Sequence, residues 1–149
     1  KYYNEVISGN MRLDEMQAAF LRVKLKSLSA WTKERQVIAK KYIERLKGVG
    51  DIVLPVTHPQ ATHSYHLFVI RSKSRNLLQE HLNANGVGTL IHYPLPIHKQ
   101  KAYSDKKIVY QSTDKADLLA NTALSLPLWV GMSDSDIDYV SGRIIEFFK

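Results

Sequence analysis

Apolar residues in the first third of the chain recur at intervals of mostly three and four positions. The first series consists of Leu13, Met16, Phe20, Val23, Leu28 and Trp31, and the second of Val37, Ile38, Tyr42 and Leu46. This spacing follows the period of an α-helix, so it predicts two amphipathic helices in a helical region over residues 13–48. Gly48 and Gly50 provide the backbone freedom that commonly ends a helix.

After Gly50 the pattern changes to short apolar runs separated by helical spacing. Residues 53–55 predict a short strand that ends in a turn. Residues 65–70 are rich in β-branched and aromatic side chains and predict a buried strand. Leucines within residues 77–82 predict a helix closed by an Asn-Gly pair, and residues 87–91 predict another strand. The expected order is therefore strand, helix, strand.

Two further helices are predicted in the last third of the chain. Alanine and leucine positions over residues 116–123 indicate a short helix. The sequence Ser-Asp-Ser-Asp at residues 133–136 is typical of an N-terminal helix cap, and it precedes apolar positions with helical spacing up to Phe148. Helices alternate with short strands and no repeat is visible, so we expect an α/β or α+β domain with a small sheet covered by helices.

The composition is that of one globular domain. The chain has 149 residues, of which 44% are hydrophobic and 23% are charged, so it can bury a sizeable core. No apolar run approaches the length that spans a bilayer, and we expect no membrane partner. The chain begins at Lys1 with neither an initiator Met nor the apolar segment of a signal peptide, which predicts an internal piece of a longer protein. The absence of cysteine excludes disulfides and zinc–thiolate sites and fits a reducing, cytoplasmic location.

The net charge of +7 permits an anionic partner, so the distribution of the basic residues matters more than their number. Basic residues of the first half are spread along the predicted helices, where solvent-exposed faces account for them. Four lysines between residues 99 and 107 have only Tyr103 and Tyr110 near them. The sequence contains no nucleic-acid-binding module and no platform of basic and aromatic residues, so we expect no nucleic-acid partner.

Asn10 and Arg12 form the first candidate site. They lie on a short loop just before the first predicted helix, where backbone N–H groups carry partial positive charge. The Asn amide can donate hydrogen bonds, and the Arg guanidinium fits phosphate oxygens. This junction predicts an anion site; the alternative is a helix cap at Asn10 and a surface ion pair at Arg12.

Residues 92–98, with the sequence His-Tyr-Pro-Leu-Pro-Ile-His, form the second candidate site. The two prolines fix their own φ and favour extended conformations for Tyr93 and Leu95. A loop of this stiffness can direct Tyr93 and His98 into a pocket, where phenol and imidazole groups bind sugar hydroxyls or phosphate oxygens. His92 is either a further substrate contact or a hydrogen-bonded core histidine.

Several segments resemble one known family in the order in which they occur. They are residues 10–19, with the sequence Asn-x-Arg-Leu-Asp-Glu-x-Gln-Ala-Ala, residues 24–25, 65–70, 86–98 and 124–128. Together they resemble the DegT/DnrJ/EryC1/StrS family of pyridoxal-phosphate-dependent sugar-nucleotide aminotransferases over essentially the whole chain. The resemblance implies the C-terminal small domain of a fold-type I aminotransferase. Residues 1–12 then form a cofactor and substrate loop, residues 13–48 a long helical region and residues 49–149 a small α/β domain.

The same resemblance implies roles for individual residues. Asn10 reaches across a homodimer interface to the cofactor phosphate of the neighbouring subunit, and Arg12 lies in the same anion-binding region. Lys1 approaches the diphosphate of the sugar nucleotide. The 92–98 loop, through His92, Tyr93 and His98, belongs to a family block and is expected to bind the sugar substrate.

The implied reaction moves an amino group, from a donor such as glutamate, to a keto sugar carried on a nucleoside diphosphate. Pyridoxal phosphate is the cofactor. In the family the Schiff-base lysine lies in the N-terminal large domain, which precedes Lys1, and no lysine of this chain lies in a matching motif. We therefore expect this chain to be inactive by itself.

Two other functions fit parts of the sequence. The pairs His63 with His66 and His92 with His98 suggest a metal site, although no carboxylate lies near either pair at a ligand-like spacing. A non-catalytic interaction or dimerisation domain is the other alternative, with the apolar face of the helix over residues 13–31 as its contact surface.

Overall fold

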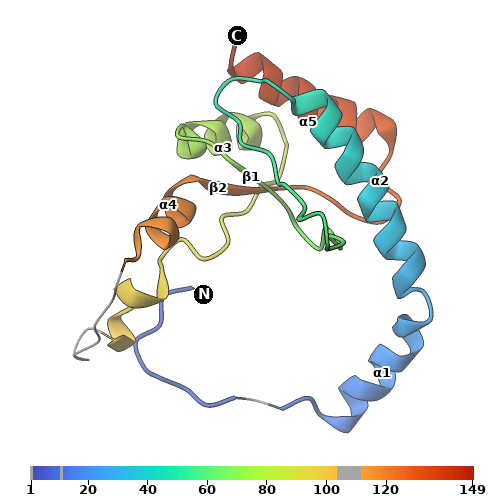
Figure 1. Ribbon diagram of the computed structural model, residues 1–149, viewed down its shortest axis with the longest axis vertical. Helices are drawn as coiled ribbons and strands as arrows, with labels where there is room; N and C mark the ends of the chain where they lie inside the picture. The colour runs from blue at the N-terminus through green and yellow to red at the C-terminus, as the bar shows by residue number, and fades with distance from the viewer. Residues whose placement is uncertain (1, 11, 104–111) are drawn as a thin grey trace.

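The computed structural model describes residues 2–10, 12–103 and 112–149. Along these ranges, helices alternate with short strands, as Figure 1 shows. In chain order the elements are α1 (Glu15–Leu25), α2 (Leu28–Leu46), β1 (Phe68–Arg71), α3 (Arg75–Ala84), the 3₁₀ turns η1 (Ile97–Lys99) and η2 (Lys101–Tyr103), α4 (Asp114–Thr122), β2 (Ala123–Leu126) and α5 (Asp134–Phe147). The predicted mixture of helices and a small sheet is confirmed.

The strands β1 and β2 form an antiparallel pair at the centre of the domain. Phe68 lies opposite Leu126, and Ile70 lies opposite Leu124. Side chains alternate between the two faces of a strand, so these four residues share one face. None of the four is more than 4% exposed. This face of the sheet therefore forms one side of the hydrophobic core.

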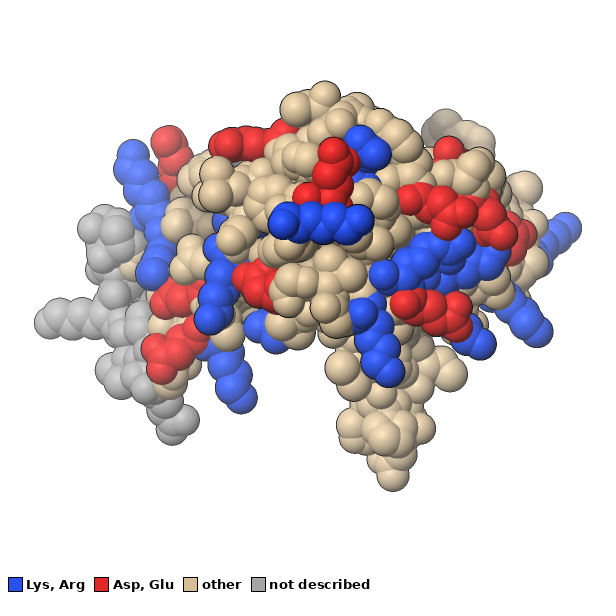
Figure 2. All heavy atoms as spheres, turned by 90° about the horizontal axis from the view of Figure 1, so that it is seen from above, with Lys and Arg blue, Asp and Glu red and all other residues tan. Residues whose placement is uncertain are grey.

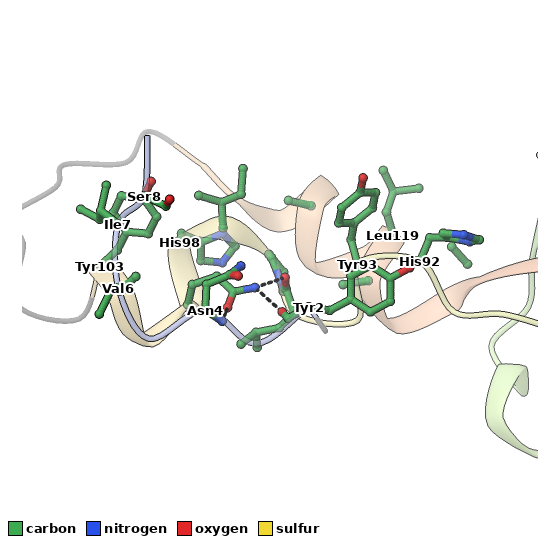
Figure 3. Close-up of a pocket in the computed structure, with 18 residues that line it drawn as sticks. Tyr2, Asn4, Val6, Ile7, Ser8, His92, Tyr93, His98, Tyr103 and Leu119 are labelled. Carbon is green, nitrogen blue, oxygen red and sulfur yellow. Dashed lines mark hydrogen bonds between the residues drawn. The ribbon is translucent and has the colours of Figure 1, made fainter. Parts of the chain in front are cut away.

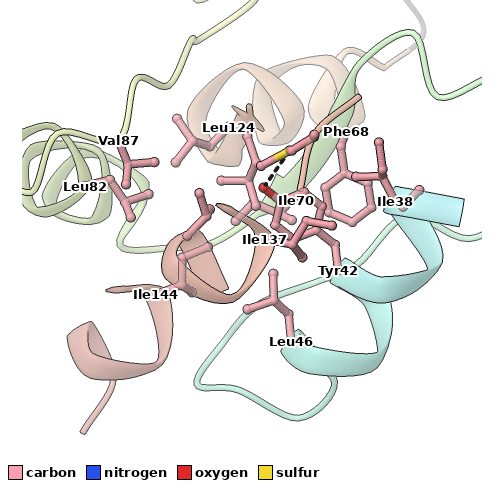
Figure 4. Close-up of a cluster of buried hydrophobic side chains, with 14 of the residues drawn as sticks. Ile38, Tyr42, Leu46, Phe68, Ile70, Leu82, Val87, Leu124, Ile137 and Ile144 are labelled. Carbon is pink, nitrogen blue, oxygen red and sulfur yellow. Dashed lines mark hydrogen bonds between the residues drawn. The ribbon is translucent and has the colours of Figure 1, made fainter. Parts of the chain in front are cut away.

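Helices α2, α3 and α5 cover this face of the sheet. Their buried core residues are Ile38, Ala39, Tyr42 and Leu46 of α2, Leu78 and Leu82 of α3, and Ile137, Val140 and Ile144 of α5. Figure 4 shows side chains from these helices meeting over the two strands. The ring of Tyr42 stacks on Phe68 with a centroid distance of 5.0 Å, and its hydroxyl donates to the carbonyl oxygen of Pro127 at 3.0 Å. Burial raises the pKa of Tyr42 well above its ordinary value.

The predicted ends of two helices are confirmed. At the start of α5, the backbone N–H of Asp136 donates to Ser133 Oγ at 3.2 Å, and the carboxylate of Asp136 accepts the backbone N–H of Ser133 at 3.1 Å. This reciprocal arrangement is a capping box. The helix α3 is followed by Asn85 and by Gly86, whose φ of +73° favours glycine.

Charged side chains of both signs are interspersed on the face drawn in Figure 2. Lys41 of α2 pairs with Asp134 of α5, and Arg45 pairs with Asp138 at 2.5 Å. The hydrogen bond from Lys41 lowers the pKa of Asp134. These contacts link two helices that also pack together in the core.

Helices α1 and α2 lie within residues 13–48, but the break between them differs from the prediction. The helix α1 ends at Leu25 and α2 begins at Leu28, whereas the sequence placed the break after Trp31. The step from Val23 to Leu28 is the longest interval in the first apolar series, and the break falls within it. A step of five departs from the helical period, so one straight helix cannot keep both residues on one face.

No residue of α1 is buried, and Figure 1 shows this helix at one extremity of the molecule. Its large apolar side chains are exposed; they include Met16, Phe20, Leu21, Val23 and Leu25. The amphipathic pattern therefore marks a face that nothing within the described ranges covers. No helix in these ranges has both the length and the hydropathy of a membrane span.

The strands differ from the prediction in extent. Tyr65 has a φ of +45°, which is outside the range of a strand, and β1 begins only at Phe68. Residues 53–55 and 87–91 each contribute one isolated bridge instead of a strand. Ala123, predicted at the end of a helix, begins β2, because it pairs with Arg71 of β1 and the three residues after it are buried.

Candidate functional site

A cavity of about 880 Å³ lies on the other side of the sheet from the core helices. The N-terminal segment (residues 2–8), the loop over residues 92–103, and α4 with the start of β2 enclose it. In Figure 3, Tyr2, His92, Tyr93 and Leu119 lie at one end, His98 lies in the middle, and Val6, Ile7, Ser8 and Tyr103 lie at the other end. The predicted substrate residues His92, Tyr93 and His98 all line this one cavity.

Tyr93 has an unusual backbone conformation. Its φ is +55°, in the left-handed region, so the extended conformation predicted from the following proline is wrong. The ring of Tyr93 meets that of Tyr2 edge to face, with a centroid distance of 5.6 Å. This contact favours a conformation that local preference disfavours by about 1–3 kcal/mol. Tyr93 is 73% exposed, so its phenol stands at the open side of the cavity.

His92 is anchored on the sheet. Its Nδ1 lies 2.8 Å from Oγ of Ser125, which is 5% exposed on β2, and the hydrogen bond orients the imidazole. The ring of Tyr2 also contacts the imidazole of His92, with a centroid distance of 6.3 Å. His92 is therefore hydrogen-bonded to a buried residue, as expected of a core histidine, and it also lines the cavity, as expected of a substrate contact.

His98 belongs to a small cluster of charged groups. Its Nε2 lies 3.2 Å from Oδ1 of Asp117 on α4, and Nζ of Lys99 lies 2.7 Å from the same oxygen. The hydrogen bond from Lys99 is the main reason why the pKa of Asp117 is lowered. Asp117 therefore connects α4 to η1 and orients His98 beside the cavity. Asp117 could not be identified from the sequence, because its contacts to His98 and Lys99 depend on tertiary packing.

Gln100 was also missed from the sequence, where it stands between two lysines and resembles a surface residue. In the structure it is 6% exposed. Its Oε1 accepts the backbone N–H of Asn4 at 2.8 Å, and its Nε2 donates to the carbonyl oxygens of Tyr2 at 2.8 Å and Leu95 at 3.1 Å. One amide therefore joins the N-terminal segment to the loop over residues 92–103.

Asn10 and Arg12 lie outside the cavity. They follow Ser8, the last N-terminal residue that lines it, and both are exposed. Neither side chain forms a hydrogen bond or ion pair within the described part of the chain. The N-cap of α1 is Asp14, which accepts the backbone N–H of Gln17 at 2.8 Å, so the alternative of a helix cap at Asn10 is wrong. Lys1, the remaining predicted substrate residue, lies outside the described residues.

The histidines proposed as an alternative metal site have other contacts. Nδ1 of His63 accepts the backbone N–H of Tyr65 at 2.8 Å. His92 and His98 bind Ser125 and Asp117, as described above. The ranges that the structure describes contain no group of three or more His, Asp or Glu residues arranged to hold a metal ion.

Comparison with known proteins identifies sugar aminotransferases as similar proteins. The chain is 47% identical over 140 residues to the erythromycin biosynthesis sensory transduction protein EryC1 of Saccharopolyspora erythraea, covering 94% of this chain and 38% of that protein. It is 42% identical over 128 residues to dTDP-3-amino-3,4,6-trideoxy-alpha-D-glucose transaminase of Streptomyces venezuelae, covering 86% of this chain and 34% of that protein. The chain thus spans about two fifths or less of the length of these relatives.

Comparison of the fold with solved structures agrees with the comparison of sequences. The crystal structure of DesV from S. venezuelae, in complex with a ketimine intermediate, matches all of this chain and 40% of that chain, with a TM-score of 0.85 and 38% identity. The predicted fold, the small domain of a fold-type I aminotransferase, is thereby confirmed. Residues 1–145 match the model of the DegT/DnrJ/EryC1/StrS aminotransferase family, whose members depend on pyridoxal phosphate. The chain belongs to the DegT/DnrJ/EryC1/StrS aminotransferase family.

Proposed function

We propose that the whole protein containing this chain transfers an amino group from a donor such as glutamate to a keto sugar carried on a nucleoside diphosphate. The observation that carries this proposal is the cavity, because three polar side chains of a family block converge there. The names of the similar proteins, which include a dTDP-sugar transaminase, support the substrate class.

The cavity residues have the chemistry that sugar binding requires. Most of the lining is apolar and suits the faces of a sugar ring, while phenol and imidazole groups bind hydroxyl and phosphate oxygens. His92 is oriented by its hydrogen bond to Ser125, and Tyr93 contacts the ring of Tyr2, so both side chains have a partner that directs them at the cavity. His98 adds a group that can donate to an oxygen or transfer a proton. We propose that Lys1 contacts the diphosphate.

The chain fits one part of a cofactor site, the phosphate-binding part. Asn10 and Arg12 are exposed donors with no partner in the described ranges, which is the state expected of groups that bind a phosphate supplied by another subunit. No lysine lines the described cavity, so we place the lysine that holds the cofactor in the preceding part of the whole protein. When bound, pyridoxal phosphate supplies the electron sink for moving the amino group.

We further propose that the active protein is a homodimer, because the exposed Asn10 and Arg12 do not face the cavity of their own chain. In this arrangement each subunit supplies phosphate donors to the site of its neighbour. The chain by itself then lacks both the cofactor lysine and the neighbouring site, and is inactive.

The test uses the purified whole protein loaded with pyridoxal phosphate. Glutamate is expected to change the visible absorbance of the cofactor, and a keto sugar nucleotide to restore it with formation of an amino sugar detected by mass spectrometry. If no keto sugar nucleotide restores the absorbance, the proposed acceptor class is wrong. If glutamate causes no change but another amino acid does, the proposed donor is wrong.

A further inference from the structure

The N-terminal segment over residues 2–8 forms one wall of the cavity through few contacts. Among the described residues, its backbone is joined to the loop over residues 92–103 by the side chain of Gln100 and by the hydrogen bond from the N–H of Ala102 to the carbonyl oxygen of Asn4 at 3.0 Å. Gln100 is 6% exposed, so its amide has little access to water as an alternative partner, although the bonds themselves are part-buried. We propose that Gln100 is a positioning residue, which holds this segment against the 92–103 loop and thereby forms the wall that binds the sugar substrate.

The position of Gln100 in the backbone suits this role. It follows η1 and precedes η2, and its own N–H donates to the carbonyl oxygen of Ile97 at 3.1 Å. The side chain therefore projects from a segment fixed on both sides by tight turns. The amide nitrogen of Gln100 donates to both sides of the cavity: to the carbonyl oxygen of Tyr2 in the N-terminal segment and to that of Leu95 in the 92–103 loop. Figure 3 shows these bonds as dashed lines between the two walls.

The consequence for the cavity follows through Tyr2. The carbonyl group of Tyr2 accepts from Gln100, and its ring contacts both His92 and Tyr93. The ring of Tyr2 supports Tyr93 in its left-handed conformation, as shown above. If Gln100 loses its donors, Tyr2 is released and Tyr93 loses the contact that opposes its local preference. The effect is expected in sugar binding, and not in the hydrophobic core, which lies on the opposite face of the sheet.

The inference rests on the proposed function, and its test separates the two. In the whole, cofactor-loaded protein, Gln100→Glu keeps the size and one acceptor but removes both donors, while Gln100→Met removes all polar atoms at similar volume. Gln36→Glu is the matched control, because Nε2 of Gln36 also donates to a backbone carbonyl, that of His63 at 2.9 Å, on an exposed surface. Hydrogen exchange measured by mass spectrometry reports on residues 2–8 without any need for activity.

We expect exchange of the Asn4 amide to accelerate at least about tenfold in Gln100→Met, because this variant removes the acceptor of its hydrogen bond. The Ala102 amide, which donates to the carbonyl oxygen of Asn4, should exchange faster in both variants, because both remove the donors that hold Tyr2 and Leu95. Peptides from α3 and α5 should exchange as in the control, which shows that the core is folded. KM for the keto sugar nucleotide should rise roughly tenfold, while kcat stays close to that of Gln36→Glu.

Three results overturn some part of this scheme. Unchanged exchange in residues 2–8 shows that Gln100 does not hold the segment. Faster exchange with an unchanged KM shows that Gln100 has only a structural role, and the positioning role is then wrong. If the wild-type protein has no aminotransferase activity, the proposed function fails, whereas the exchange measurement still decides whether Gln100 holds the segment.

Discussion

Tyr42→Phe is expected to weaken the domain in a way that depends on pH. The substitution keeps the ring stacked on Phe68 and removes only the hydroxyl that donates to the carbonyl of Pro127. Tyr42 is fully buried, and the variant leaves the half-buried carbonyl of Pro127 without this partner. At neutral pH we expect a loss of about 1–2 kcal/mol in the free energy of unfolding, the usual cost of a buried hydrogen bond with one partner removed.

The sign of the pH dependence follows from the raised pKa of Tyr42. In the unfolded chain its phenol ionises near the ordinary value of 10, whereas in the folded domain it retains its proton well above that pH. Between these values the unfolded state binds fewer protons, so wild-type stability falls as pH rises above 10. Tyr42→Phe lacks this effect. The difference between the two proteins should therefore shrink by about 1.4 kcal/mol for each pH unit above 10.

Urea denaturation followed by fluorescence between pH 7 and pH 11 measures this difference. Tyr139→Phe is the control, because the hydroxyl of Tyr139 also donates to a backbone carbonyl, that of Asn85 at 2.8 Å, but the residue is 51% exposed. The control should lose less than about 0.5 kcal/mol. A difference between wild type and Tyr42→Phe that stays constant from pH 7 to pH 11 would refute the reasoning.

Three further predictions concern the whole enzyme and the isolated chain. Asn10→Ala and Arg12→Ala should each weaken retention of pyridoxal phosphate roughly tenfold or more, measured by equilibrium dialysis, because each removes donors to a charged phosphate. Mixing Asn10→Ala subunits with subunits that lack the cofactor lysine should restore activity, because both defects then fall in one site of each mixed dimer. Inactive mixed dimers would contradict the cross-subunit role of Asn10. Tyr93→Phe and His98→Ala should raise KM for the sugar nucleotide and leave cofactor absorbance intact, and a loss of absorbance instead would place these residues at the cofactor. Borohydride treatment of the isolated chain with pyridoxal phosphate should give only scattered labelling, and one specifically trapped lysine would disprove the expected absence of a cofactor lysine.

Local patterns predicted the helices, apart from the break between α1 and α2, and they singled out the loop over residues 92–98. The capping sequence before α5 and the glycine after α3 act through short-range geometry, so the sequence alone predicts them. The loop over residues 92–98 was identified from its prolines and polar side chains, and the structure brings His92, Tyr93 and His98 to one cavity.

Features that depend on tertiary contacts were not predictable in this way. The left-handed φ of Tyr93 opposes the local preference before a proline and is supported by the ring of Tyr2, about ninety positions earlier in the sequence. The role of Gln100 could not be predicted for the same reason, because its partners Tyr2 and Asn4 are equally distant in the sequence. The strand β2 was missed because Ala123 continues the apolar spacing of α4, and only pairing with β1 shows where the helix ends.

Alternate residues of β2 serve the hydrophobic core and the cavity. Leu124 and Leu126 point into the core against β1, whereas Ser125 holds His92 and Ala123 lines the cavity on the opposite face. Alternate positions along one short segment are therefore subject to separate selection, for folding on one side and for ligand choice on the other. Substitutions at Ala123 or Ser125 would act first on the cavity side, through its lining or through the orientation of His92, and not on the packing of Leu124 and Leu126. The cavity side of this strand can therefore vary while its core side is kept.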